Sequence, residues 1–252
     1  MPDAVAIAFL AFVGLLVGSF LNVVVHRLPR GESLSRPRSR CVGCGVQIAG
    51  YDNVPVVSWI LLRGRCRHCG EPISVRYPLI EALTALTFAG VAAIAGIDPE
   101  LWLELPFAAL MIAVAAIDLE HRIVPNRLLV PAVAWALVGW AVVDAGFLPE
   151  ALAAGAGAFT FLLLAALAYP AGMGMGDVKL AGAMGLYLGI AVVPALAIAF
   201  LAGSVVGIGY LVRDGRDARK TGVPFAPFLA FGGLVGLLAG SELISLYADR
   251  FL

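Results

Sequence analysis

The stretch that organises this sequence is a glycine-rich turn, Gly172-Met173-Gly174-Met175-Gly176-Asp177-Val178-Lys179-Leu180. Glycine adopts both signs of φ without steric cost, so glycines at alternate positions let the backbone bend tightly and let another segment approach closely. The turn lies between two long apolar runs and carries one acidic and one basic side chain. Asp177 is therefore a candidate functional residue. Gly174, Gly176 and Lys179 belong to the same motif and are supporting residues of a functional site or a hinge.

The composition is that of an integral membrane protein. Hydrophobic residues make up 61% of the 252 residues and charged residues 13%, and the mean hydropathy is +0.96. Soluble domains contain roughly 45 to 50% apolar residues. No basic segment precedes the first apolar run, so we expect a retained membrane helix there rather than a cleaved signal. No nucleic-acid-binding motif stands out, and membrane lipid is the expected environment.

Apolar runs of about 20 residues are long enough to cross a bilayer. The chain contains about eight such candidate spans, at residues 4–25, 79–97, 101–117, 128–143, 151–169, 178–193, 195–212 and 224–247. The predicted fold class is an all-α polytopic membrane protein with a polar loop. We expect three parts: residues 1–25 as the first transmembrane helix, 26–78 as an Arg-rich tetracysteine loop, and 79–252 as a transmembrane catalytic core of about seven helices.

The positions of the basic residues predict the orientation of these spans. Lys and Arg gather in cytoplasmic loops of membrane proteins. With the N-terminus outside, every Lys and Arg except Arg250 faces inward, in residues 27–76, in the turn at 122–127, at Lys179 and in the charged loop 213–220. This arrangement predicts a multi-pass membrane protein with the polar loop on the cytoplasmic side.

The four cysteines all lie in the polar loop, as two CxxC pairs that are each followed by glycine: Cys41, Cys44, Cys66 and Cys69. A CxxC turn presents two thiolates to one metal, and two such turns complete a closed four-sulfur site, as in a zinc ribbon. Two disulfides are the alternative, but disulfides are rare in the reducing cytosol. We predict a structural Zn²⁺ that holds the loop together, with His68 exposed.

Two aspartates are expected at the same edge of the membrane, because Asp118 ends the third predicted span and Asp177 begins the sixth. Two carboxylates that share a proton can act as in aspartic proteases: the ionised one accepts a proton from water, and the protonated one donates to the carbonyl under attack. Structural roles are the alternatives. In this alternative interpretation, Asp118 is an interfacial charge that pairs with Arg122 or Arg127, and Asp177 caps its helix or pairs with Lys179. The residues alone leave both interpretations open.

Other polar residues and other functions give weaker signals. Ser19 lacks a convincing histidine partner for serine protease chemistry. Glu81 lies a few residues into the second predicted span, where it either pairs as a buried acid with Arg76 or snorkels at the interface, and we favour the interfacial role. A proton-coupled transporter that uses the two aspartates as a relay is the alternative function. A membrane scaffold that binds partners through the zinc loop is a third possibility, and it predicts that conservative changes of either aspartate are harmless.

The motifs in combination resemble the type IV prepilin peptidases, the bacterial branch of the GxGD aspartic proteases. The resemblance rests on residues 18–29, the two CxxC pairs with 51–59 between them, and residues 76–81, 118–126 and 174–180. It covers most of the chain. Each piece alone is modest, but their combination in this order is highly specific.

The resemblance implies that Asp118 and Asp177 are the catalytic pair of an endopeptidase at the membrane edge. It also implies the substrate, the leader of a type IV prepilin or pseudopilin, which is cut at the cytoplasmic face. Members of this family with a tetracysteine loop typically also N-methylate the new N-terminus with S-adenosylmethionine. Near the C-terminus this chain has Phe225-Ala226-Pro227 where the family usually has Phe-Gly-Pro.

Overall fold

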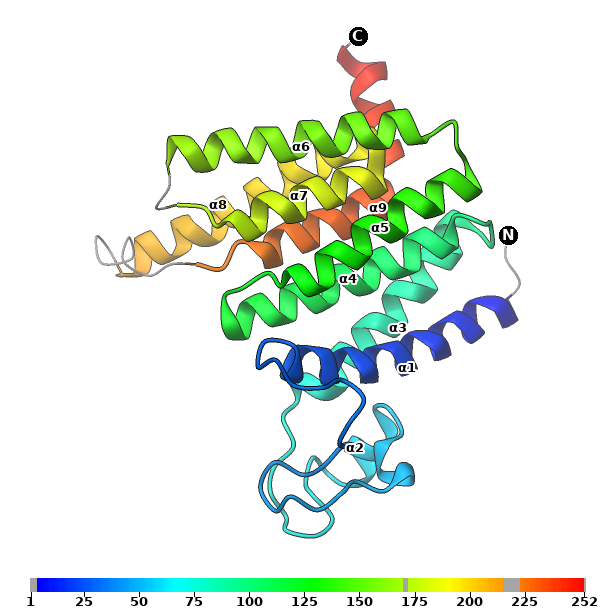
Figure 1. Ribbon diagram of the computed structural model, residues 1–252, viewed down its shortest axis with the longest axis vertical. Helices are drawn as coiled ribbons and strands as arrows, with labels where there is room; N and C mark the ends of the chain where they lie inside the picture. The colour runs from blue at the N-terminus through cyan, green and yellow to red at the C-terminus, as the bar shows by residue number, and fades with distance from the viewer. Residues whose placement is uncertain (1–3, 170–171, 215–222, 252) are drawn as a thin grey trace. The chain divides into compact units, whose positions relative to one another are not determined.

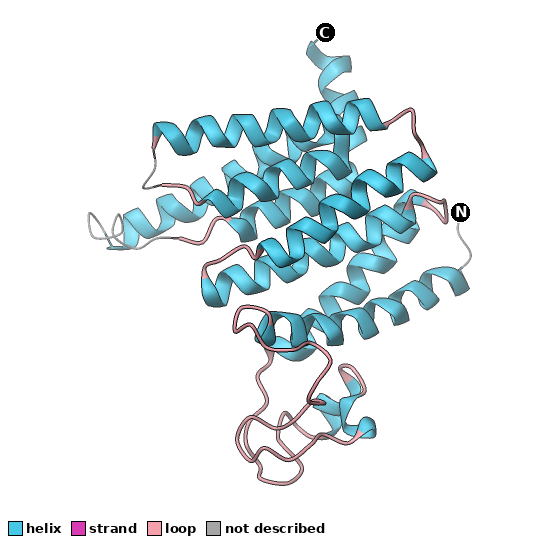
Figure 2. Ribbon diagram, viewed as in Figure 1, coloured by secondary structure: helices cyan, strands magenta, loops and turns pink. Residues whose placement is uncertain are grey.

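The computed structural model of the protein describes residues 4–169, 172–214 and 223–251. Within them loops join helices, without a β-strand (Figure 2), which confirms the predicted all-α fold. The elements are α1 (Ala4–Arg27), η1 (Gly50–Asn53), α2 (Val57–Leu61), α3 (Arg76–Ala95), α4 (Leu101–His121), α5 (Asn126–Val143), α6 (Leu148–Ala168), α7 (Met175–Leu188), η2 (Gly189–Ala191), α8 (Val192–Asp214) and α9 (Ala226–Phe251). They form two compact units, Met1–Ile97 and Asp98–Leu252.

Seven helical segments of the described chain are long and apolar enough to cross a membrane. One of them, Met175–Arg213, contains both α7 and α8, between which the chain reverses so that α8 returns past α7 (Figure 1). The sequence placed this division at Pro194, which is wrong. The reversal lies earlier, at η2, where Gly189 adopts φ +53°. Pro194 instead lies in the first turn of α8, where the missing N–H has no intrahelical partner to lose.

In the unit Met1–Ile97, α1 packs antiparallel against α3 through small residues. A Cβ on Gly14 would lie 2.7 Å from the Cα of Ala85, and a Cβ on Gly18 would lie 2.6 Å from the Cα of Glu81. One turn further along, the side-chain nitrogen of Asn22 donates to the Tyr77 carbonyl at 3.0 Å. Small residues four apart let helix backbones approach closely, as is common in membranes. These two helices carry the polar loop between them.

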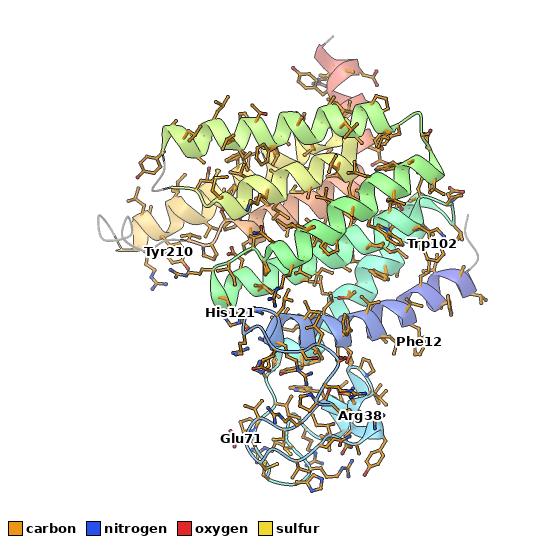
Figure 3. All side chains as sticks on the ribbon, viewed as in Figure 1. Phe12, Arg38, Glu71, Trp102, His121 and Tyr210 are labelled. Carbon is orange, nitrogen blue, oxygen red and sulfur yellow. The ribbon has the colours of Figure 1, made fainter. Side chains whose placement is uncertain are left out.

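In the unit Asp98–Leu252, α4 and α7 belong to the central core of the helix bundle. The Phe107 ring of α4 stacks on Tyr187 of α7 with centroids 4.9 Å apart, and the Tyr187 hydroxyl donates to the Ala132 carbonyl of α5 at 2.7 Å. Gly185 lets α7 approach α6, because a Cβ there would lie 2.6 Å from the Ala154 carbonyl oxygen. Figure 3 labels Trp102 and His121 near the two ends of α4. The rigid core thus fixes the ends of α4 and α7.

Two predictions, the charged loop at 213–220 and the division of the chain into three parts, are not tested by the packing of the helices. Arg216, Arg219 and Lys220 of the charged loop lie outside the described residues. The division of the chain at residues 25 and 78 follows the expected membrane boundaries rather than compactness, and it stays a prediction.

Candidate active site and cysteine centre

Asp118 lies in the last turn of α4 and is buried, with 6% of its surface exposed. The helix ends just after it because Arg122 adopts a left-handed conformation, and the Arg122 N–H donates to the Asp118 carbonyl at 2.9 Å. The Asp118 side chain is held from another helix: its Oδ2 accepts a hydrogen bond from the backbone N–H of Ala226 at 3.2 Å. The carboxylate therefore meets the N-terminus of α9, which carries partial positive charge.

Asp177 lies in the first turn of α7 and has 9% of its surface exposed. Gly174 is the N-cap of this helix, with extended backbone angles. The Asp177 carboxylate accepts a hydrogen bond from the Gly174 backbone, as an acidic residue at the third helical position does in a capping box. The predicted capping role is therefore present. It orients the carboxylate without excluding a chemical role.

Asp118 and Asp177 belong to the same compact unit, and the charge of Asp118 acts on Asp177. Within the described residues neither aspartate has a Lys or Arg nitrogen within ion-pair distance. The charge of Arg122 reaches Asp118, but Lys179 is directed elsewhere, and its Nζ donates to the Asn126 side chain at 3.1 Å. The arrangement is a pair of buried carboxylates held by backbone N–H groups, which suits proton transfer.

Gly176 explains how α7 comes so close to the turn after Asp118. A Cβ at Gly176 would lie 2.9 Å from the Cβ of Val124, which is too short for any real contact. A Cβ at Gly174 would meet nothing closer than 3.6 Å. The absence of a side chain at Gly176 is therefore what lets Asp177 approach the α4–α5 turn, whereas Gly174 serves as the cap.

Sequence reasoning missed the contribution of Ala226 to this site. The residue is fully buried and is the first residue of α9. Pro227 gives a partial signal, because proline favours the first turn of a helix, and so it indicates that free N–H groups begin here. The sequence contains no sign that such a group meets Asp118, which lies 108 residues away along the chain.

The four cysteines converge as predicted. Their sulfur atoms all lie within 4.8 Å of one another, and the Sγ atoms of Cys41 and Cys69 are 3.7 Å apart. A tetrahedral metal with bonds of about 2.3 Å to sulfur needs sulfur atoms about 3.8 Å apart. The two CxxC turns have the same hydrogen bonds: Gly45 N–H donates to the Cys41 carbonyl at 3.0 Å, and Gly70 N–H to that of Cys66 at 2.9 Å. The geometry fits one metal ion.

The thiols of this centre do not ionise alike in the absence of a cation. Hydrogen bonds from the backbone of Cys69 and then of His68 lower the pKa of Cys66 to about 6. The backbone of Glu71 acts to lower the pKa of Cys69, but desolvation and the neighbouring sulfurs outweigh it and raise that pKa to about 12. Four thiolates this close repel one another, and a bound cation relieves that repulsion. His68 is exposed, as predicted.

The structure corrects the expected role of Glu81. The side chain is not at a wet interface: it is 7% exposed within the α1–α3 contact. Its Oε2 accepts the Val56 backbone N–H at 2.7 Å, and the carboxylate also hydrogen-bonds with Ser19. Hydropathy could not reveal this, because the donor that makes burial of the carboxylate tolerable lies in the loop.

Membrane-length helices, two buried aspartates and a four-sulfur centre together are the features of a multi-pass membrane protein. The family model described as Bacterial Peptidase A24 N-terminal domain matches residues 12–95, and that of the Type IV leader peptidase family matches residues 105–212. Each match lies within one of the two compact units.

Relatives match over most of the chain. A Prepilin leader peptidase/N-methyltransferase of Burkholderia pseudomallei (strain 1026b) is 37% identical over 96% of this chain and 88% of its own length. One of Bacillus subtilis is 32% identical over 96% and 97%. One of Myxococcus xanthus is 40% identical over 84% of this chain, which spans 65% of that relative. The comparison with solved structures finds no match. The chain belongs to the type IV leader peptidase family.

Proposed function

We propose that this protein is an aspartic endopeptidase that removes the leader peptide of type IV prepilins or pseudopilins at the cytoplasmic face of the inner membrane. The observation that carries the proposal is the buried pair Asp118 and Asp177, set at the ends of two core helices. Family membership supports peptidase chemistry, and nothing favours the proton-coupled transporter.

The chemistry follows from the pair. One carboxylate is ionised and takes a proton from a water molecule, whose oxygen attacks the scissile carbonyl carbon. The other carboxylate is protonated and donates its proton to the carbonyl oxygen. When the tetrahedral intermediate collapses, the C–N bond breaks and the leaving amine receives a proton from the dyad. The N–H groups of Gly174 and Ala226 hold the carboxylates in place during these transfers.

We propose further that the protein N-methylates the newly formed N-terminus, as the names of its relatives indicate for them. S-adenosylmethionine would supply the methyl group. A Zn²⁺ ion would bind Cys41, Cys44, Cys66 and Cys69, and its role would be structural, because four thiolates leave no open position for a substrate.

The test is mass spectrometry of the N-terminus of a prepilin co-expressed with this protein in a host without its own leader peptidase. We expect loss of the leader together with one added methyl group. Leader loss without methylation would leave the peptidase proposal alone standing, and a full-length, unmodified substrate would refute both proposals.

The contact at Gly176 gives a specific prediction for the peptidase. Gly176→Ala places a methyl group against Val124, so the α4–α5 turn must move away and carry Asp118 with it. Misplacement of a catalytic group by about 1 Å lowers a rate by about a hundredfold, and we expect a decrease of that order in leader cleavage. The matched control is Gly174→Ala, where the new Cβ makes only ordinary contacts. Equal cleavage by the two variants would contradict this role of Gly176.

A further inference from the structure

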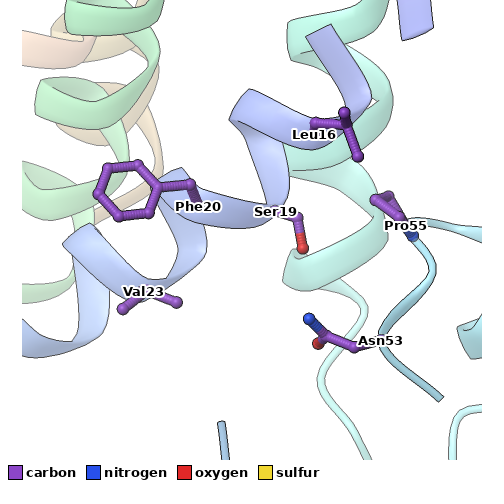
Figure 4. A pocket seen from close by; sticks show the side chains of 6 residues that line it. All are labelled: Leu16, Ser19, Phe20, Val23, Asn53 and Pro55. Carbon is purple, nitrogen blue, oxygen red and sulfur yellow. The ribbon is translucent and has the colours of Figure 1, made fainter. Parts of the chain in front are cut away.

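The unit Met1–Ile97 contains a cavity of about 280 Å³ that the aspartate pair does not use. It lies between α1 and the segment before α2, and its walls are Leu16, Ser19, Phe20, Val23, Asn53 and Pro55 (Figure 4). Most of this lining is apolar. The polar exceptions are the Ser19 hydroxyl and the Asn53 amide, which Figure 4 shows turned toward the same space. The cavity therefore combines apolar walls with one hydroxyl and one side-chain amide, as ligand sites do.

A buried carboxylate lies behind this polar wall. Glu81 hydrogen-bonds with Ser19, and its Oε2 accepts the Val56 N–H at 2.7 Å. One backbone N–H and one hydroxyl satisfy hydrogen-bonding positions but do not neutralise a full negative charge, so the site favours a cation that reaches Ser19. The chemistry of the wall therefore suits an ammonium group, which can donate to the Ser19 and Asn53 oxygens.

The backbone beside the cavity is held in an unusual conformation. Val56, a β-branched residue, has φ +61°, a strained backbone conformation that persists only where neighbours enforce it. The Ser58 hydroxyl accepts the Val54 N–H at 2.9 Å and donates to the Tyr51 carbonyl at 3.0 Å. The strain is thus maintained next to Asn53 and directs the Val56 N–H at Glu81.

An ion pair fixes the other end of the same segment. Arg67 donates hydrogen bonds to the Asp52 carboxylate, the shortest being from Nε at 2.8 Å and from Nη2 at 2.6 Å. These bonds from Arg67 hold the pKa of Asp52 below its usual value. Asn53 therefore follows a residue that is tied to the second CxxC turn, and the position of its amide depends on the cysteine loop.

One face of α1 leads to the cavity and is apolar and exposed. Val5, Phe9, Phe12, Leu16 and Phe20 recur at helical spacing along it, and each is roughly half exposed or more. Such a stripe is suited to contact with lipid or with another apolar helix. The stripe ends at Ser19 and Asn53, so an apolar helix that lies along it would place its terminus at the polar wall.

We propose that this cavity binds the free N-terminal ammonium of the leader-cleaved peptide, while the apolar helix of that peptide lies along the exposed stripe of α1. The ammonium donates to the Ser19 hydroxyl oxygen and the Asn53 carbonyl oxygen, and the Glu81 carboxylate provides the compensating negative charge. The inference rests on the proposed function, because cleavage creates this ammonium, and it assigns the product's new terminus to a site outside the aspartate pair.

The test measures binding of two synthetic peptides to the full chain in phosphatidylglycerol nanodiscs. Both carry the apolar N-terminal helix of the processed substrate, one with a free amine and one acetylated. We expect wild type to bind the free amine at least about tenfold more tightly, the value of one good charge-assisted contact. Ser19→Ala and Glu81→Gln should remove most of that preference. Equal binding of the two peptides by wild type would overturn the proposal.

Controls separate this site from general damage and from lipid binding. Thr87→Val, also on α3, removes a hydroxyl that bonds only within its own helix, to the Leu83 carbonyl at 2.8 Å, and should keep the preference. Ser19→Ala retains the Glu81 charge and decides the case if Glu81→Gln fails to fold. If phosphatidylethanolamine in the nanodiscs abolishes the preference completely, the cavity is a lipid headgroup site and the proposal is wrong.

Leader cleavage is measured on the same nanodisc preparations, so that failure of the proposed peptidase function can be told apart from failure of the proposed ammonium site. We expect Thr87→Val to cleave a leader-bearing peptide at the wild-type rate, because its hydroxyl bonds only within its own helix. If wild type does not cleave, the proposed function fails. If wild type cleaves but shows no preference for the free amine, only the present inference fails.

Discussion

Replacement of either Asp118 or Asp177 by asparagine is expected to lower the rate of leader cleavage by about 10² to 10⁴ fold. Asparagine keeps the size of the side chain and an oxygen that can accept the Ala226 or Gly174 N–H, so the local fold should persist. It cannot hold or release a proton near neutral pH. Both variants should be equally inactive, because each member of the pair needs the other.

The measurement is the rate of leader loss from a purified prepilin, followed by mass spectrometry. Asp144→Asn is the matched control in the same unit. Its side chain accepts the Gly146 N–H at 2.9 Å and has no part in the site, and asparagine preserves that bond. A variant at Asp118 or Asp177 that cleaves like Asp144→Asn would show that the pair is not the catalyst. That result would return both residues to the structural roles of cap and interfacial charge.

Much of the fold could be predicted because long apolar runs have few alternatives to membrane helices. The sequence predicts that Asp118 and Asp177 lie at the same edge of the membrane, because each is at the inner end of a predicted span. It does not predict that they are close to each other, because hydropathy locates the spans along the chain and does not show which helices are in contact. The close contact of Gly176 with Val124 supplies what was missing. The glycine motif predicted that another segment packs closely against this turn, but the sequence does not show which segment that is.

Two features that were predicted wrongly, the break at Pro194 and the place of Glu81, share a physical cause. Pro194 looks like a helix break, yet proline is compatible with a first helical turn, and the actual reversal depends on the backbone of Gly189. Glu81 looks interfacial because an isolated carboxylate is costly to bury. A backbone N–H presented by Val56, from a strained loop, offsets that cost. Such long-range backbone donors leave no trace in local composition, and the Ala226 N–H at Asp118 is another example.

The cysteine loop has almost no core of its own, and we therefore propose that its folding depends on a metal. Between residues 28 and 75 only Ser58 and Gly64 are buried. A segment with so little buried surface cannot offset the entropy of ordering its chain. Binding of Zn²⁺ by four thiolates contributes about 10 kcal/mol or more at neutral pH. That free energy is large enough to decide whether the loop is folded.

Cys41→Ser combined with Cys44→Ser is therefore expected to reduce the bound metal, from one zinc ion per chain in wild type to a trace. N-methylation of the cleaved peptide should be lost, because the loop carries Asn53 and the strained Val56 backbone. Leader cleavage should persist, because the aspartate pair belongs to the other compact unit. Elemental analysis of the purified protein and mass spectrometry of its product measure the three quantities together.

The matched control is His68→Ala, which changes an exposed residue between the second pair of cysteines and should leave metal content and both activities unchanged. Retention of zinc by the double cysteine variant would contradict the four-sulfur site. Loss of zinc with normal methylation would separate the metal from methyl transfer. Loss of leader cleavage together with zinc would show that the cysteine loop also supports the aspartate pair. Only the combination of no zinc, no methylation and normal cleavage agrees with a structural metal that serves the second reaction.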